Sequence, residues 1–177
     1  VPGHDISGVI APVGSGVPDP WRPGMTVTVS PYSNCGICPA CRRQRPNCCR
    51  ANQTLGVQRD GALTEFIVVP WQKLFHSERL GPRDLVLVEP LTVGAHAVAR
   101  GEVTAADVVC VLGCGAIGLG AVAAAAFRQA TVIAVDIDDA KLRIARAAGA
   151  GHVVNSARDD LLATLAALTG GDGPTVV

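Results

Sequence analysis

Four cysteines at short spacing are the first residues of this chain that indicate chemistry. Cys35, Cys38, Cys41 and Cys49 follow the pattern C-x2-C-x2-C-x7-C. Four thiolates on a compact loop can bind one zinc ion tetrahedrally, and a zinc with four protein ligands has no open position for a substrate. The spacing therefore predicts a structural zinc site that folds the loop at residues 33–53.

Two alternatives to this ligand set stay open. The cysteines could be unligated core residues or a redox C-x-x-C pair, although three evenly spaced cysteines and a fourth fit zinc better. Cys48 adjoins Cys49 and could replace it as the fourth ligand. A zinc bound by four thiolates has a net negative charge, so nearby cations should stabilise the site. The basic residues that flank it in sequence are Arg42, Arg43, Arg45 and Arg50.

A glycine-rich segment predicts a second binding site. Residues 113–118 read G-C-G-A-I-G, which is the pattern G-x-G-x-x-G between an expected strand and an expected helix. In this context the first glycine makes a tight turn, the second lets a pyrophosphate approach the backbone, and the third lets helix and strand pack closely. The alternative interpretation is that these glycines serve only tight packing of the chain and bind no ligand. The residues predicted to bind a dinucleotide are Gly113, Gly115, Ile117 and Gly118.

An acidic residue at the end of the next expected strand bears on which dinucleotide binds. A carboxylate at Asp136 can accept hydrogen bonds from ribose hydroxyls and would repel a 2′-phosphate. We therefore expect NAD rather than NADP. Lys141, on the following helix, could reach a ribose or a phosphate. The alternative role for Asp136 is to cap that helix.

Three further polar residues are candidates for a second metal site. His4 and Asp5 lie near the start of the sequence, and Glu89 precedes Pro90. A lone histidine beside a glycine is more often a satisfied structural residue than a ligand, so spacing alone does not assign these three residues.

The elements that would position these residues change in character between residues 80 and 90. Before this point, short β-branched segments between Gly and Pro residues predict a small barrel or sandwich, with strands at 8–11, 25–29 and 64–69. A helix at 85–100 would connect the two parts. After residue 105, alternating strands and helices predict a parallel sheet. The expected strands are 108–112, 131–135 and 152–154, and the expected helices are 116–127, 140–148 and 160–168, the last capped by Asp159.

Charge and composition disfavour several classes of protein. The chain has 15 basic and 15 acidic residues and 3% aromatic residues, so it lacks the basic surface typical of nucleic-acid binding. No apolar run reaches membrane-spanning length. Clustered cysteines without a secretory signal favour metal binding in a reducing cytoplasm. The start at Val1 and the strand-like residues 175–177 indicate that both ends are incomplete.

The order of these features resembles the zinc-containing medium-chain dehydrogenases, and within them the branch of sorbitol, threonine and sugar-acid dehydrogenases. The resemblance rests on the Gly-His-acid motif, the four-cysteine loop, the segment Glu89–Arg100 and the glycine-rich turn, and it covers essentially the whole chain. It implies an α/β protein with a partial GroES-like β-barrel catalytic domain at 1–84. A partial Rossmann domain with a doubly wound parallel sheet would follow at 85–177.

The resemblance also implies a catalytic zinc in the cleft between these domains. His4 would be a ligand, Asp5 stands where the family usually has glutamate, and Glu89 would bind the metal directly or hold its water. The family's first ligand is a cysteine upstream of the Gly-His motif. No cysteine precedes Cys35, so we read that ligand as lost with the N-terminus. The resemblance favours Cys49 as the fourth structural ligand.

The expected reaction is oxidation of a secondary alcohol in a polyol, sugar or sugar acid, with zinc as a Lewis acid and NAD as the hydride acceptor. We expect a homodimer or homotetramer at full length and no activity from this piece alone. A threonine or simple alcohol dehydrogenase of the same family, and a zinc-stabilised nucleotide-binding protein without catalysis, remain alternatives. A zinc-ribbon nucleic-acid-binding protein would explain the cysteines but not the glycine-rich turn.

Overall fold

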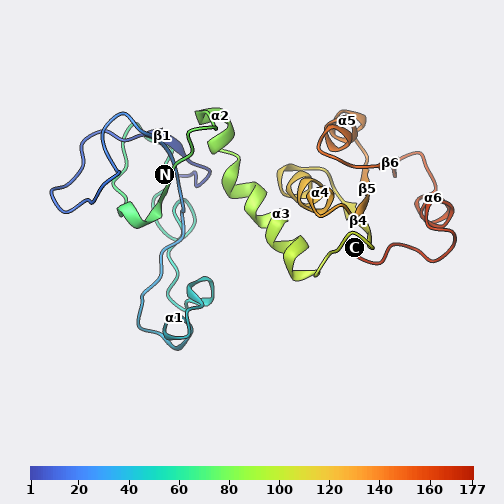
Figure 1. Cartoon of the computed structure of the whole chain (residues 1–177), viewed down its shortest axis with the longest axis horizontal. Helices are drawn as coiled ribbons and strands as arrows, with labels where there is room; N and C mark the ends of the chain where they lie inside the picture. The colour runs from blue at the N-terminus through green and yellow to red at the C-terminus, as the bar shows by residue number, and fades with distance from the viewer. The chain divides into compact units, whose positions relative to one another are not determined.

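Figure 1 shows the computed structural model of the chain, which describes residues 1–177. The chain forms two compact units, Val1–Glu89 and Pro90–Val177. The division falls inside helix α3 (Val88–Arg100), which follows the one-turn helix α2 (Pro82–Leu85). The sequence predicted one helix here and a boundary between residues 84 and 85. Each unit has its own sheet and its own buried apolar residues, so each is described by itself.

The first unit contains a three-stranded antiparallel sheet in the order β1-β2-β3. Strand β1 (Ser7–Val9) overlaps the strand expected at 8–11, and β2 (Thr26–Val29) lies within the one expected at 25–29. Strand β3 (Leu74–Phe75) pairs with the other edge of β2. β-branched residues at these positions suit a half-buried pleated surface. Ile6, Val29 and Leu55 form the buried apolar cluster of this unit, and Val27 of β2 is also buried.

The strand expected at residues 64–69 is wrong, because the structure has no strand there. Its side chains alternate as those of a strand would: Ile67 and Val69 pack against the buried cluster, whereas Phe66 and Val68 are exposed. A strand also needs a partner backbone with which to form a ladder, and no strand pairs with this segment. The alternation therefore reports which side of the segment is buried, and not the presence of a ladder.

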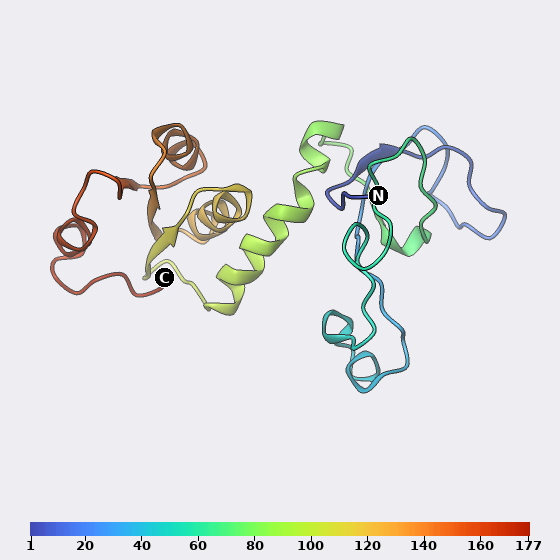
Figure 2. The same ribbon diagram turned by 180° about the vertical axis from the view of Figure 1, so that it is seen from behind.

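The cysteine-bearing loop has little regular structure. It contains the one-turn helix α1 (Pro39–Arg42) and the 3-10 turn η1 (Pro46–Cys48), each with a proline in its first turn, where the missing amide costs no hydrogen bond. Neither element contains a buried residue. Figures 1 and 2 show the loop around α1 extending away from β1. Apolar packing therefore contributes little to holding this loop.

The second unit contains a parallel sheet in the order β4-β5-β6, with a helix after each strand, which confirms the predicted parallel α/β arrangement. Each element begins and ends within one residue of its expected position, because the periodicity changes clearly between strand and helix segments. The elements are β4 (Val108–Leu112), α4 (Ala116–Phe127), β5 (Thr131–Asp136), α5 (Asp139–Ala147), β6 (His152–Asn155) and α6 (Leu161–Leu168).

Helices cover both faces of this sheet. Successive residues of β4 point to opposite faces, so Val109 and Val111 pack in the cluster that includes α4 and α5. Cys110 packs in the other cluster, which Leu161 and Leu165 of α6 cover. Figures 1 and 2 agree in placing α4 and α5 on one side of the strands and α6 on the other. The sheet therefore has the predicted doubly wound form.

Glycines allow α3 and α4 to cross closely within the second unit. A Cβ atom on Gly94 would lie 2.3 Å from the backbone nitrogen of Ala121, and one on Gly120 would lie 3.0 Å from the Cα of Leu91. A side chain at Gly94 would thus collide with the facing helix backbone. Helix α3 is the longest in the chain, with 13 residues.

None of the helices combines the length and the apolar character that a membrane span requires.

The N-cap expected at Asp159 is wrong. Asp160 caps α6, and its Oδ1 accepts the backbone amide of Ala163 at 3.0 Å. Helix α5 is capped by Asp138, whose Oδ1 accepts the amide of Ala140 at 2.7 Å. Asp138 therefore fills the capping role that was the alternative for Asp136, two residues upstream.

Candidate metal and coenzyme sites

The four cysteines of the loop bring their sulfur atoms together. The Sγ atoms of Cys35, Cys38, Cys41 and Cys49 all lie within 4.8 Å of one another. The Cys38 and Cys41 sulfurs are 3.5 Å apart, and those of Cys35 and Cys49 are 3.6 Å apart. Sulfurs bound tetrahedrally at about 2.3 Å from one zinc stand about 3.8 Å from each other. None of the four forms a disulfide, and the donor set fits a four-thiolate zinc site.

Backbone amides point at these sulfurs. Hydrogen bonds from the amides of Cys41 and Arg50 lower the pKa of the Cys38 thiol to about 6. The Cys49 sulfur accepts the amide of Cys35 at 3.3 Å. Burial has the opposite effect at Cys41 and raises the pKa of its thiol to about 11. Amide donors therefore favour the thiolate form, which is the form that binds zinc, at Cys38, whereas burial opposes it at Cys41.

The structure separates the two adjacent cysteines that the sequence left as alternatives. Cys49 is buried among the gathered sulfurs, whereas Cys48 is exposed and lies outside the group. Arg42 donates a hydrogen bond to the carbonyl of Ile37 within the loop. The flanking basic residues are all exposed, namely Arg42, Arg43, Arg45 and Arg50.

Three residues from two distant segments form the second candidate metal group. One ligand atom from each of His4, Asp5 and Glu89 lies within 4.8 Å of the others. His4 and Asp5 precede β1, and Glu89 lies in the first turn of α3. Glu89 is 9% exposed, whereas Asp5 is exposed. One imidazole and two carboxylates form a mixed nitrogen and oxygen donor set, which suits zinc and other divalent ions.

Tyr32 adjoins this group and was not predicted from the sequence. Its hydroxyl donates a hydrogen bond of 2.5 Å to Oε1 of Glu89. This hydrogen bond, burial, and the charges of Glu89 and Asp5 raise the pKa of Tyr32 to about 12. Tyr32 precedes Glu89 by 57 residues. No sequence motif links a tyrosine to a glutamate at that separation, so only the folded structure reveals the contact.

The three glycines of the turn after β4 differ in why they are needed. Gly113 has a φ of +93°, a conformation that favours glycine. A Cβ atom on Gly118 would lie 1.8 Å from the carbonyl oxygen of Gly113, so only glycine fits there. Gly115 has a φ of −74° and no atom within 4 Å of its Cβ position. The fold does not require glycine at position 115, and the open space leaves its backbone accessible to a ligand.

Asp136 is a buried acidic residue beside this turn. One carboxylate oxygen accepts the amide of Cys114 at 2.7 Å, and the other accepts the amide of Asp138 at 3.0 Å. These hydrogen bonds hold the pKa of Asp136 below its usual value, and the residue is 9% exposed. Asp136 is therefore ionised at neutral pH, and it ties the end of β5 to the glycine-rich turn.

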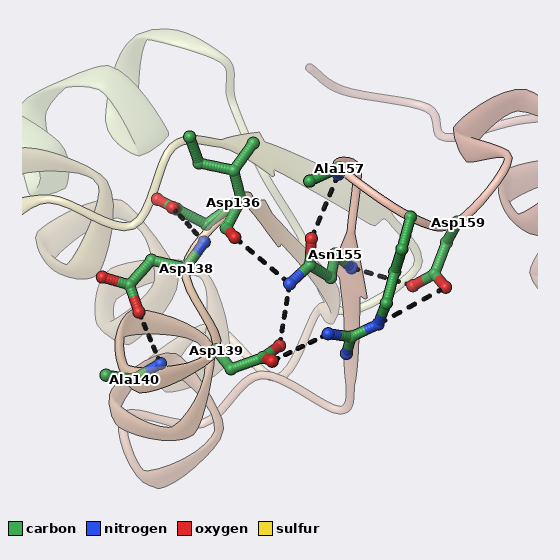
Figure 3. A network of polar contacts seen from close by, with 9 residues as sticks. Asp136, Asp138, Asp139, Ala140, Asn155, Ala157 and Asp159 are labelled. Carbon is green, nitrogen blue, oxygen red and sulfur yellow. Dashed lines mark hydrogen bonds and ion pairs between the residues drawn. The ribbon is translucent and has the colours of Figure 1, made fainter.

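A polar network fixes the segment that follows Asp136 (Figure 3). The Nδ2 of Asn155 donates to the carbonyl of Ile137 at 3.2 Å and to Oδ1 of Asp139 at 2.8 Å. Arg158 forms an ion pair of 2.7 Å with Asp139 and, with Asn155, lowers the pKa of Asp139 to about 2. Asn155 is 5% exposed. Asn155 was not predicted from the sequence, although an asparagine directly after an expected parallel strand indicates a polar residue at the carboxyl edge of the sheet.

The other two residues predicted to contact a coenzyme are exposed. Ile117 lies in the first turn of α4 and is 54% exposed. Lys141 lies on α5, and its charge adds to the lowering of the pKa of Asp136. Neither side chain is buried, so both remain accessible to a ligand at the ends of β4 and β5.

Comparisons with known proteins identify the family. Residues 1–79 match the family model of the alcohol dehydrogenase GroES-like domain, and residues 116–177 match that of zinc-binding dehydrogenase. Together with the parallel sheet and the antiparallel unit that precedes it, these matches confirm the resemblance and the predicted fold class. The chain belongs to the zinc-type medium-chain dehydrogenase family.

Relatives and solved structures match nearly the whole chain. Sorbitol dehydrogenase of Bacillus subtilis (strain 168) is 36% identical over 177 residues, 98% of this chain and 50% of that protein. A structure of a short chain alcohol dehydrogenase (rspB) of Escherichia coli CFT073 with NADH superposes with a TM-score of 0.84 and 35% identity, covering 96% of this chain and 51% of that one. A zinc-binding dehydrogenase of Sinorhizobium meliloti 1021 bound to NADP has a TM-score of 0.84 and 34% identity, covering 91% and 47%. The chain spans about half the length of the curated relatives it matches.

Proposed function

We propose that this chain is part of a zinc-containing, NAD-dependent oxidoreductase that oxidises a secondary alcohol of a polyol, sugar or sugar acid. The observation that carries the proposal is the gathering of His4, Asp5 and Glu89, because residues so distant in sequence bring ligand atoms within 4.8 Å of one another. The similarity to a sorbitol dehydrogenase supports a substrate of the polyol class.

The proposal assigns different roles to the two metal groups. Cys35, Cys38, Cys41 and Cys49 would hold a structural zinc with no open position. His4, Asp5 and Glu89 would hold a second zinc with fewer than four of this chain's side chains, which leaves room for other ligands. Zinc bound there supplies Lewis acidity, which lowers the pKa of an alcohol.

The coenzyme assignment rests on charge and space at the ends of β4 and β5. The open backbone at Gly115 and the amides of the first turn of α4 suit a pyrophosphate. The ionised Asp136 would accept hydrogen bonds from ribose hydroxyls, and with Asp138 and Asp139 it would disfavour a 2′-phosphate. A nicotinamide coenzyme held there would supply a hydride acceptor.

The overall reaction needs no further reactant. A secondary alcohol and NAD⁺ give a ketone, NADH and one proton, so NAD⁺ is the only oxidant, and no protein nucleophile is needed. In this assignment the chain's own residues bind the metal, orient the coenzyme and exclude NADP. Assembly into a homodimer or homotetramer stays a prediction.

The test is an assay of the full-length protein against a panel of polyols, sugar acids, L-threonine and primary alcohols, with NAD or NADP. We expect NAD-linked oxidation of a polyol, sugar or sugar acid, its loss when zinc is removed by a chelator, and its return when zinc is added back. Turnover that persists without zinc, or a stronger response to threonine or primary alcohols, would refute the proposed reaction or its substrate class.

A further inference from the structure

We propose that Tyr32 is a positioning residue for Glu89. Its phenolic hydroxyl would hold the Glu89 carboxylate in the orientation in which it joins His4 and Asp5 to bind a divalent cation. The proposal rests on the metal-binding role proposed above for His4, Asp5 and Glu89, and it adds to that site a residue that does not bind the metal itself. The observation behind it is the 2.5 Å hydrogen bond from the Tyr32 hydroxyl to Glu89 Oε1.

The backbone that carries Tyr32 is well fixed. Pro31, the preceding residue, is among the most buried side chains of the chain, and its carbonyl accepts the amide of Leu55 at 3.1 Å. One residue earlier, the amide of Ser30 donates to the carbonyl of Lys73 at 2.8 Å, beside β3. A donor mounted on backbone held in this way can hold a glutamate in one rotamer.

The exposure of Tyr32 argues against a role in core packing alone. The residue is 44% exposed, yet its hydroxyl is directed at a carboxylate that is 9% exposed. The hydroxyl donates its hydrogen to Oε1 of Glu89, so it acts on this carboxylate as a hydrogen-bond donor. Hydrogen-bond partners outside the ligand shell orient metal-binding carboxylates and reduce the freedom that binding must remove. Tyr32 therefore acts on the metal through Glu89.

The first experiment measures zinc affinity at the second site. The full-length protein is loaded with one equivalent of zinc, which the four cysteines take up, and further zinc is titrated against a competing chelator. Tyr32→Phe removes only the hydroxyl, and we expect it to weaken binding of the second zinc by about 10- to 100-fold while the first zinc stays bound. The matched control is Phe66→Leu, an exposed aromatic residue of the same unit, which should leave both affinities unchanged.

The second experiment observes the hydrogen bond without any metal. Tyr32 is the only tyrosine of the chain, so incorporation of 3-fluorotyrosine gives a single ¹⁹F resonance. Without metal, we expect this resonance to differ between the Glu89→Gln variant and the unsubstituted chain. We also expect the resonance of the unsubstituted chain to shift when zinc is added. Circular dichroism of each variant checks that the fold is retained.

The outcomes separate this proposal from the proposed function. If Tyr32→Phe binds the second zinc as tightly as the unsubstituted chain, the positioning role is refuted and the metal site stands. If the unsubstituted full-length protein binds no second zinc, the metal site is refuted and the role of Tyr32 with it. A ¹⁹F resonance that does not respond to Glu89→Gln would refute the hydrogen bond itself.

Discussion

Cys48 and Cys49 are neighbours in sequence with different surroundings. Cys49 is buried with its sulfur among the other three, whereas Cys48 is exposed outside the group. We predict that Cys49→Ser lowers bound zinc by about one ion per chain, because a hydroxyl is a poor replacement for a thiolate, and that Cys48→Ser does not. Elemental analysis after dialysis against a mild chelator measures the difference.

Cys48→Ser serves as the matched control for this comparison. If Cys49→Ser kept its full zinc content and only the double variant Cys48→Ser/Cys49→Ser lost zinc, Cys48 would have replaced Cys49 as a ligand. Such a result would contradict the separation of the two sulfurs in the structure.

Asp136 should determine the coenzyme. We predict that Asp136→Gly combined with Ile137→Arg shifts the ratio of the NADP and NAD dissociation constants toward NADP by roughly 10- to 100-fold, because it replaces a carboxylate with a cation that pairs with the 2′-phosphate. Titration of each coenzyme by calorimetry gives the two constants.

Asp172→Asn is the matched control, since it removes one exposed acidic charge after α6. It should leave the NAD and NADP constants unchanged. The prediction fails if the unsubstituted protein already binds NADP more tightly than NAD.

The residues that the sequence could predict are those whose partners are close in sequence or follow a fixed motif. The cysteines lie within 15 positions of each other, and the glycines follow a strand and begin a helix. Tyr32 and Asn155 have partners on other segments, and only the folded chain brings these partners together. Their roles depend on tertiary contacts that single-sequence patterns do not contain.

At the level of elements, two glycines of one turn should respond oppositely to the same change. We predict that Gly118→Ala lowers the free energy of unfolding by about 1–3 kcal/mol or more, because its Cβ would collide with the Gly113 carbonyl. Gly115→Ala should cost less than about 1 kcal/mol but weaken NAD binding by roughly tenfold, since its Cβ would occupy only the open space. Urea unfolding and NAD titration measure the two effects.

Each variant is the control for the other. A Gly115→Ala protein that bound NAD normally would mean that the ligand does not approach this part of the turn. A Gly118→Ala protein of unchanged stability would mean that α4 can move away from β4 without cost.

The elements of the second unit were predicted nearly residue by residue, and those of the first unit were not. In the parallel sheet, buried apolar strands alternate with alanine-rich helices, so both local periodicity and burial point to the same assignment. At residues 64–69 the alternation was correct but the ladder is absent, because strand formation depends on a partner backbone that local pattern does not specify.

At the scale of the whole molecule, the two units have separate apolar clusters, and the cysteine loop lies outside both. We predict that removing zinc with a strong chelator increases hydrogen exchange at residues 33–53 and leaves the exchange of β4, β5 and β6 unchanged, because the only buried residues of the loop are Cys38 and Cys49. Hydrogen-exchange mass spectrometry with and without the chelator measures this.

Zinc added back in excess should restore protection of the loop, which controls for damage by the chelator. Loss of protection throughout the parallel sheet would contradict the independence of the two units.

Val109 also forms a parallel bridge with Val176, and this bridge has a consequence for how the parallel sheet is used. Val109 already pairs with Val132 of β5, so Val176 must lie along the opposite edge of β4. The strand order therefore reverses direction at β4. In open α/β sheets such a reversal leaves a crevice at the carboxyl ends of the strands, and dinucleotides bind across this crevice. The glycine-rich turn follows β4 at that point, with Asp136 on the β5 side of it. We expect the adenosine half of the coenzyme on that side and the nicotinamide half toward Val176, so that coenzyme choice and hydride transfer are governed by opposite sides of one strand.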